Sequence, residues 1–176
     1  MKNFIFIVLL TCFLISKQDN INAGPMVGYS TKMEVALWIQ TTTQSDVKFA
    51  YWDIDNPNQV FETDNFITDK ISGFTATLVA DKVKPGTVYQ YQPIIDGIKI
   101  NFGYDLKFQT QKHWEYRTNP PDFTFAFGSC AYTNEIEKDR PGKSYGGDYF
   151  IYSSILEQNP DFMLWLGDNV YFREPD

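Results

Sequence analysis

The chain has 176 residues and a formal net charge of −7, with 43% hydrophobic and 17% aromatic residues. An acidic chain of this kind is a poor ligand for nucleic acid or an anionic membrane surface, because both repel negative charge. Only two cysteines occur, Cys12 and Cys130, which excludes a disulfide framework. The length suits one ordinary domain, or one small domain with part of another.

Residues 1–23 have the pattern of an export leader. Lys2 precedes an apolar stretch from Phe4 to Ile15, and Ile21-Asn22-Ala23 fits a small-residue cleavage site before Gly24. No paired arginines occur, which favours the general secretory route. We therefore expect an exported protein (periplasmic, cell-surface or extracellular) with no membrane span after leader cleavage; a retained membrane anchor is the alternative. Cleavage takes the net charge from −7 to −8.

Residues 24–110 are predicted to form an all-β domain. Short alternating or aromatic-rich runs are separated by turn clusters such as Asp96-Gly97, a spacing typical of a small β-sandwich. The runs are Glu34–Gln40, Val47–Trp52, Thr75–Val79, Thr87–Ile94 and Ile98–Phe102, and the cluster Asp55-Asn56-Pro57-Asn58 separates the second run from the third.

The segment Val83–Tyr91, VKPGTVYQY, sharpens this prediction. A Pro-Gly turn followed by Thr-x-Tyr-x-Tyr resembles the tyrosine corner of fibronectin type III domains. The resemblance implies that the Tyr89 hydroxyl bonds to the backbone just upstream. A generic hairpin with surface tyrosines is the alternative.

Residues 111–122, QKHWEYRTNPPD, are polar and end in Pro120-Pro121, as expected of a linker between domains. The single histidine, His113, lies in this segment. A lone histidine in a linker is usually solvated or structural, so we do not assign it to a metal site.

After the linker the pattern of apolar residues changes and predicts a strand, a helix and a second strand. Phe123–Phe127 is a short apolar strand, 148–158 reads as a helix stopped by Asn159-Pro160, and Phe162–Leu166 is an apolar run that suits a fully covered strand. This order predicts a βαβ unit with parallel strands and a right-handed crossover. Both following turns then lie at one edge of the sheet.

Three candidate metal ligands follow those strands: Cys130 after the first, and Asp168 and Tyr171 after the second. A nearby cation favours the thiolate and phenolate forms that ligate it. Thiolate, phenolate and carboxylate together suit Fe(III), with Asp168 bridging to a second divalent ion, and two such ions activate a water for attack on a phosphoryl group. Each residue also has a structural interpretation, for Cys130 that of a buried small hydrophobe.

The loop between the first strand and the helix, 128–147, is long for a compact domain. Ordered loops of this length are often binding or active-site loops. A solvated excursion without function is the alternative.

The blocks FTFAFGSCAY and DFMLWLGDNVYF, with a helix between them, resemble the start of the catalytic domain of the alkaline phosphatase D (PhoD-like) family of exported metallophosphatases. The resemblance implies a fibronectin type III-like sandwich followed by the first βαβ unit of an α/β metallophosphatase four-layer sandwich at 123–176. It also implies a phosphomonoesterase or phosphodiesterase acting on small phosphate esters, in which Cys130 and Tyr171 bind Fe(III) and Asp168 bridges to Ca(II) or another divalent ion.

Two departures from the family qualify that resemblance. Relatives are exported by the twin-arginine route, and their later ligand blocks have no counterpart here. Three ligands cannot complete two metal shells, so we expect the sequence to be the amino-terminal part of a longer enzyme and inactive by itself. The alternative is a non-catalytic exported module that binds protein or polysaccharide and carries a residual metallophosphatase segment.

Overall fold

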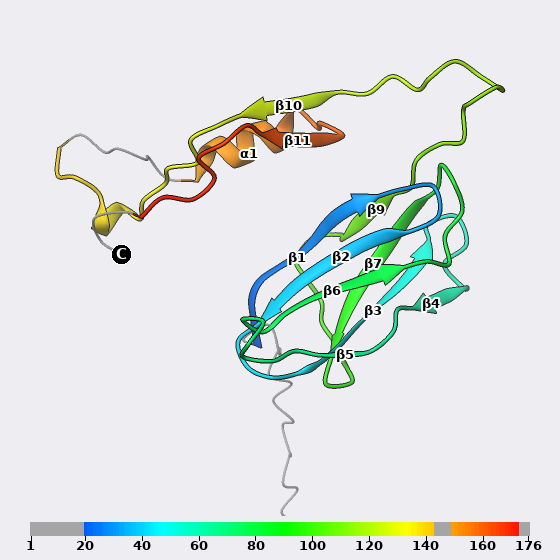
Figure 1. Cartoon of the computed structure of the whole chain (residues 1–176), viewed down its shortest axis with the longest axis horizontal. Helices are drawn as coiled ribbons and strands as arrows, with labels where there is room; N and C mark the ends of the chain where they lie inside the picture. Colours follow the sequence, from blue (N-terminus) through cyan, green and yellow to red (C-terminus); the bar gives the residue numbers. More distant parts are fainter. Residues whose placement is uncertain (1–19, 143–148, 173–176) are drawn as a thin grey trace, which may run out of the picture. The chain divides into compact units, whose positions relative to one another are not determined.

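The computed structural model describes residues 20–142 and 149–172, and the chain divides into two compact units, Met1–Trp114 and Glu115–Asp176. Figure 1 shows the described part of the first unit as strands joined by loops, and that of the second as strands with a helix. Most of the predicted leader, residues 1–19, lies outside the described residues. Its last residues, Ile21–Ala23, are described and lie in the first strand of the first unit.

The described part of the first unit pairs antiparallel throughout and contains two sheets. One has the order β1-β2-β6; the other has the order β4-β3-β7-β8, with β5 also pairing with β3 and β9 with β7. The strands are β1 (Ile21–Ser30), β2 (Val35–Thr41), β3 (Asp46–Asp53), β4 (Val60–Glu62), β5 (Phe66–Ile67), β6 (Thr75–Ala80), β7 (Val88–Ile95), β8 (Ile98–Lys99) and β9 (Lys107–Gln109).

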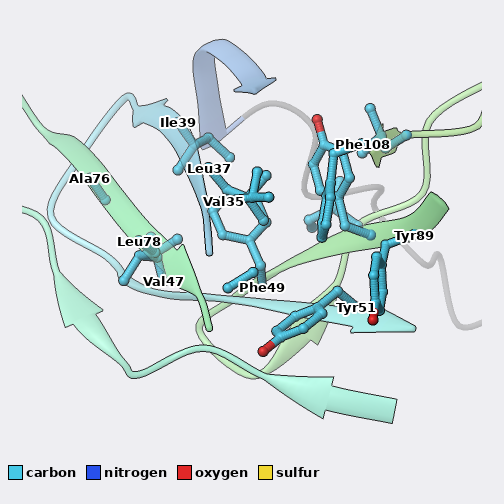
Figure 2. Packing of buried hydrophobic residues seen from close by; sticks show 14 of the residues in the cluster. Val35, Leu37, Ile39, Val47, Phe49, Tyr51, Ala76, Leu78, Tyr89 and Phe108 are labelled. Carbon is cyan, nitrogen blue, oxygen red and sulfur yellow. The ribbon is translucent and has the colours of Figure 1, made fainter. Parts of the chain in front are cut away.

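One hydrophobic core joins the two sheets, which makes the unit a β-sandwich. In β6 buried and less buried residues alternate, as expected of a strand with one face on a core. Figure 2 shows residues of β2 and β6 meeting those of β3, β7 and β9. The aromatic part of this core is a set of rings in edge and stacked contacts, which stabilises the sandwich beyond simple area burial; it comprises Phe49, Tyr51, Tyr89, Tyr91 and Phe108.

The predicted tyrosine corner is present. Gly86 adopts a positive φ of 68° in the Pro85-Gly86 turn, and the Tyr89 hydroxyl accepts a 2.9 Å hydrogen bond from the backbone N–H of Lys84. A second buried tyrosine does the same, since the Tyr51 hydroxyl accepts from the N–H of Lys82 at 3.0 Å. Two tyrosines from neighbouring strands therefore fix the segment that leads into β7.

The structure differs from the predicted strands mainly at the edges of the sheets. β1 was not expected, because Gly24, Pro25 and Gly28 interrupt its pattern; it is an edge strand with register shifts, where such residues are tolerated. The short strands β4, β5 and β9 were also missed. The run Ile98–Phe102 shortens to β8. The Ile100 N–H still bonds to the carbonyl of Pro93 in register with the β7–β8 pairing, but Pro93 has no N–H with which to continue the ladder.

The second unit has the predicted order of strand, helix and parallel strand. Its elements are β10 (Phe125–Gly128), the 3-10 turn η2 (Ile136–Lys138), α1 (Phe150–Glu157) and β11 (Phe162–Trp165), with Phe125 opposite Phe162 and Gly128 opposite Trp165. The helix stops as predicted: Asn159 has a φ of +50° and its N–H bonds to the carbonyl of Leu156. Asp148, the first residue of the predicted helix, lies outside the described residues.

The expectation of a fully covered second strand is wrong for this chain. Helix α1 covers one face of the two strands, where Tyr152 contacts Trp165 in an edge arrangement. The other face carries an exposed ladder of rings and aliphatic side chains. One helix can cover only one face of a sheet, and parallel strands are normally buried on both. We call this exposed set the aromatic face; its members are Phe123, Phe125, Phe127, Phe162, Leu164 and Leu166.

Candidate functional site

The turns that follow β10 and β11 lie side by side because the two strands are parallel and in register. Three backbone hydrogen bonds continue the pairing past the strand ends. The N–H of Leu166 bonds to the carbonyl of Gly128 at 2.8 Å, and the N–H groups of Cys130 and Ala131 bond to the carbonyls of Gly167 (3.2 Å) and Asp168 (3.0 Å). These bonds hold the Ser-Cys and Gly-Asp turns together without any contribution from a ligand.

The three side chains predicted as metal ligands meet at this edge. The Cys130 Sγ lies 3.5 Å from the Asp168 Oδ2, and the Tyr171 hydroxyl donates to the same Oδ2 at 3.2 Å. Both Cys130 and Asp168 are exposed to solvent. The structural alternative for Cys130, a buried small hydrophobe, is therefore wrong.

The backbone at the two central residues is in the left-handed region. Cys130 has a φ of 63° and Asp168 a φ of 51°, and neither is glycine. Such conformations cost about 1–3 kcal/mol each and persist where the surrounding structure fixes them, often at functional sites. Here the crossed turn-to-turn hydrogen bonds supply that constraint, and the thiol and the carboxylate are aimed at each other as a result.

The electrostatics of the cluster favour a protonated phenol in the absence of a cation. The pKa of Tyr171 is raised, first by its interaction with the Cys130 thiol, then by partial removal from water, and then by the hydrogen bond to Asp168 and the carboxylate's charge. A multivalent cation placed among the three donors reverses this balance, because it stabilises thiolate and phenolate. A cation bound by the Tyr171 oxygen would therefore have to displace the phenolic proton.

Two neighbours of the cluster were not predicted as site residues. The Tyr132 ring makes an edge contact with the Tyr171 ring at 5.0 Å, and the Ser129 Oγ lies 3.5 Å from the Cys130 Sγ. The aromatic residue two positions after Cys130 was the sequence signal for the first. Tyr132 limits the positions open to the Tyr171 ring.

The remaining predicted features are a wider metal site, His113 and the loop 128–147. Within residues 20–142 and 149–172, no group of three or more His, Cys, Asp or Glu side chains is arranged to hold a metal ion, so the cluster depends on its tyrosine. His113 is exposed and lies in the first unit, between β9 and the second unit. The loop 128–147 contains η2 and a buried Asn134, and its residues 143–147 lie outside the described residues.

One known family model matches the residues of the sandwich. A family model described as a domain of unknown function, DUF7800, matches residues 18–113, which is more than half of the chain. The chain belongs to the DUF7800 family. This family description names no activity. No curated protein matches the chain.

Comparison with solved structures finds the same architecture in a larger protein. A structure titled "Structure of PhoD" matches with a TM-score of 0.61 and 19% identity, over 82% of this chain and 27% of the PhoD chain. At that identity the match shows the fold alone, and this chain spans about a quarter of the PhoD length. The sensor domain of the anti-sigma factor RsgI4 from Pseudobacteroides cellulosolvens also matches, over 49% of this chain and 88% of its own, with a TM-score of 0.39 and 16% identity.

No helix in the described part of the DUF7800 chain combines the length and apolar character needed to cross a membrane.

Proposed function

We propose that this chain is the amino-terminal part of an exported metal-dependent phosphatase of the alkaline phosphatase D type. The observation that supports the proposal best is the convergence of Cys130, Asp168 and Tyr171 at one sheet edge. The fold similarity to PhoD agrees with it. Its substrates would be small phosphate monoesters or diesters.

The donor atoms of the cluster fit one metal ion by type and spacing. Ligands bound to one ion at about 2.0–2.3 Å are themselves about 3 Å or slightly more apart. The separations of 3.5 Å and 3.2 Å between the donor atoms of the cluster are in that range. Sulfur, phenol and carboxylate donors are an anionic set suited to Fe(III). Cys130 and Tyr171 would be its ligands, and Asp168 would be shared between the iron and a second ion, for which Ca(II) is our candidate.

In this proposal the chain's own residues supply donor groups for the metals and hold them in position. Cys130 and Tyr171 would hold the ferric ion as thiolate and phenolate, and Asp168 would supply a carboxylate. The turn-to-turn backbone bonds keep the donors in place in the absence of a cation, which lowers the cost of ordering them. A pair of bound ions would supply an activated water and would offset negative charge on a phosphoryl group.

The proposal also accounts for the incomplete donor set. Three side chains cannot fill the coordination shells of two ions, and the chain spans 27% of the solved PhoD chain. We infer that the remaining ligands come from polypeptide other than the described residues. The sandwich would support the catalytic part without taking part in the chemistry.

Metal analysis tests this proposal on the chain itself. After dialysis against ferric citrate and removal of unbound iron, we expect iron to remain with the chain, and Cys130→Ser and Asp168→Asn to lower the retained iron at least ten-fold. Glu157→Gln, in α1, is the matched control for the loss of a carboxylate and should retain iron. A chain that retains no iron, or retains it equally in all variants, would instead support the non-catalytic binding module.

A further inference from the structure

Tyr171 lies in a segment outside the helix and strands of the second unit. It comes six residues after Trp165, the last residue of β11, and residues 166–172 contain no regular secondary structure. Its neighbours Val170 and Phe172 are exposed, whereas Tyr171 itself is half-buried. Contacts of the Tyr171 side chain, as well as its backbone, therefore decide where its hydroxyl lies.

The Tyr171 side chain is held at both of its ends. At the oxygen end, the hydroxyl donates a 3.2 Å hydrogen bond to the Asp168 Oδ2. Along the ring, Tyr132 makes an edge contact, with ring centroids 5.0 Å apart and an angle of 71° between the ring planes. Aromatic pairs with this geometry attract each other beyond the effect of area burial.

Tyr132 is itself fixed by the turn that follows β10. Its N–H bonds to the carbonyl of Cys130 at 2.8 Å, and the N–H of Ala131 bonds to the carbonyl of Asp168 at 3.0 Å. Two residues further on, Asn134 is buried. The Tyr132 ring is therefore attached to the same pair of turns that carries the thiol and the carboxylate.

The two contacts of Tyr171 differ in their dependence on the phenolic proton. The hydrogen bond to Asp168 requires that proton, which a cation bound by the phenol would displace. The contact between the two rings does not involve the proton, so it would persist in the phenolate form. The ring contact is thus the support that the protonated and deprotonated forms of Tyr171 share.

We propose that Tyr132 is a positioning residue, whose ring and not its hydroxyl holds the Tyr171 oxygen beside the thiol and the carboxylate. The inference rests on the proposed function for the use of that oxygen as a metal ligand. An aromatic pair changes an equilibrium constant by about two- to ten-fold. Loss of the Tyr132 ring should therefore lower the fraction of correctly placed Tyr171 by a factor in this range.

Resonance Raman spectroscopy of the iron-loaded chain reports bound phenolate directly. The phenolate signal per bound iron should fall about two- to ten-fold in Tyr132→Ala and in Tyr132→Leu, which keeps apolar volume without the ring. It should stay unchanged in Tyr132→Phe, and in the control Tyr116→Ala, which removes a fully exposed ring of the same unit. A wild-type signal in Tyr132→Leu overturns the proposal. Loss of the signal in Tyr132→Phe also overturns it, because the hydroxyl would then be required.

A metal-free measurement separates this inference from the proposed function. In the NMR spectrum of the chain without metal, the Tyr171 ring signals, assigned by their loss in Tyr171→Phe, should be displaced by the ring current of Tyr132. Tyr132→Leu should return them towards random-coil positions, and Tyr132→Phe should not. Random-coil positions in the wild type overturn the proposal. A wild-type chain that passes this test but retains no iron supports the positioning role and contradicts the proposed function.

Discussion

At the residue scale, two tyrosine hydroxyls accept backbone hydrogen bonds from the segment before β7 and so stabilise the sandwich. The hydroxyl of Tyr89 could be predicted because its partner lies five residues away, in the same VKPGTVYQY motif. The hydroxyl of Tyr51 could not, because Lys82 is 31 residues distant and only the folded sheets bring them together.

Tyr89→Phe tests the corner. We expect this substitution to lower the free energy of unfolding of the sandwich by about 1–2 kcal/mol, because the Lys84 N–H loses its acceptor in a part-buried place. Urea denaturation followed by intrinsic fluorescence measures the change. Tyr104→Phe, at an exposed ring, is the control and should change the stability by less than about 0.5 kcal/mol. Equal effects of the two substitutions would show that the corner bond contributes nothing.

Tyr91 gives the sandwich a dependence on alkaline pH. Burial raises its pKa from 10.0 to about 12, so the folded state holds the phenolic proton more tightly than the unfolded state does. The resulting stability is fully present below pH 10 and is lost as the pH rises from 10 towards 12.

We therefore expect the free energy of unfolding to fall with pH above 10, and to fall less steeply in Tyr91→Phe, with Tyr116→Phe as the exposed control. Denaturation at a series of alkaline pH values measures the slope. Identical slopes in wild type and Tyr91→Phe would contradict the assignment. Burial of Tyr51 and Tyr89 also raises their pKa values, so some slope should remain in the variant.

The arrangement of the candidate metal ligands could be predicted only in part. Cys130, Asp168 and Tyr171 could be grouped from sequence because parallel strands end at one edge, and the structure brings them within 3.5 Å contacts. The left-handed backbone at Cys130 and Asp168 could not be predicted, because non-glycine residues rarely adopt it without a tertiary constraint.

At the element scale, the longer strands β2, β3, β6 and β7 could be predicted because their sequence pattern follows a buried face. The edge strand β1 could not, because glycine and proline are poor strand formers and its place beside β2 depends on pairing rather than on propensity. In the second unit the strands were predicted correctly, but the prediction that the second strand is fully covered was wrong. Burial depends on neighbouring elements as well as on the sequence of the strand itself.

The aromatic face should bind other apolar surfaces. Phe123 and Phe127 are 63% and 69% exposed, and exposed apolar patches of this kind bind hydrophobic dyes and promote association. We expect a double substitution, Phe125→Gln with Phe127→Gln, to lower dye fluorescence and self-association of the chain. Ile71→Gln, at a fully exposed isoleucine of the sandwich, is the control and should change neither. Unchanged dye binding in the double variant would show that the aromatic face is already covered.

At the scale of the whole molecule, the two units should respond differently to protease. The sandwich has a continuous core, whereas the second unit, where the structure describes it, has one helix on two exposed strands. We expect limited proteolysis to stop at a fragment that ends within the predicted linker, near Pro120-Pro121, and that keeps the melting transition of the sandwich. Mass spectrometry identifies the fragment. Uniform resistance of the chain would contradict this division.

The most direct test of the central claim is the visible spectrum of the ferric chain. A phenolate bound to Fe(III) gives a charge-transfer band, so we expect the iron-loaded chain to absorb in the visible range and Tyr171→Phe to lose the band. Tyr132→Phe, which alters the neighbouring ring 5.0 Å away, should keep it. A band that survives Tyr171→Phe, or an iron-loaded chain with no band at all, would contradict the assignment of Tyr171 as a ligand of a ferric phosphatase centre.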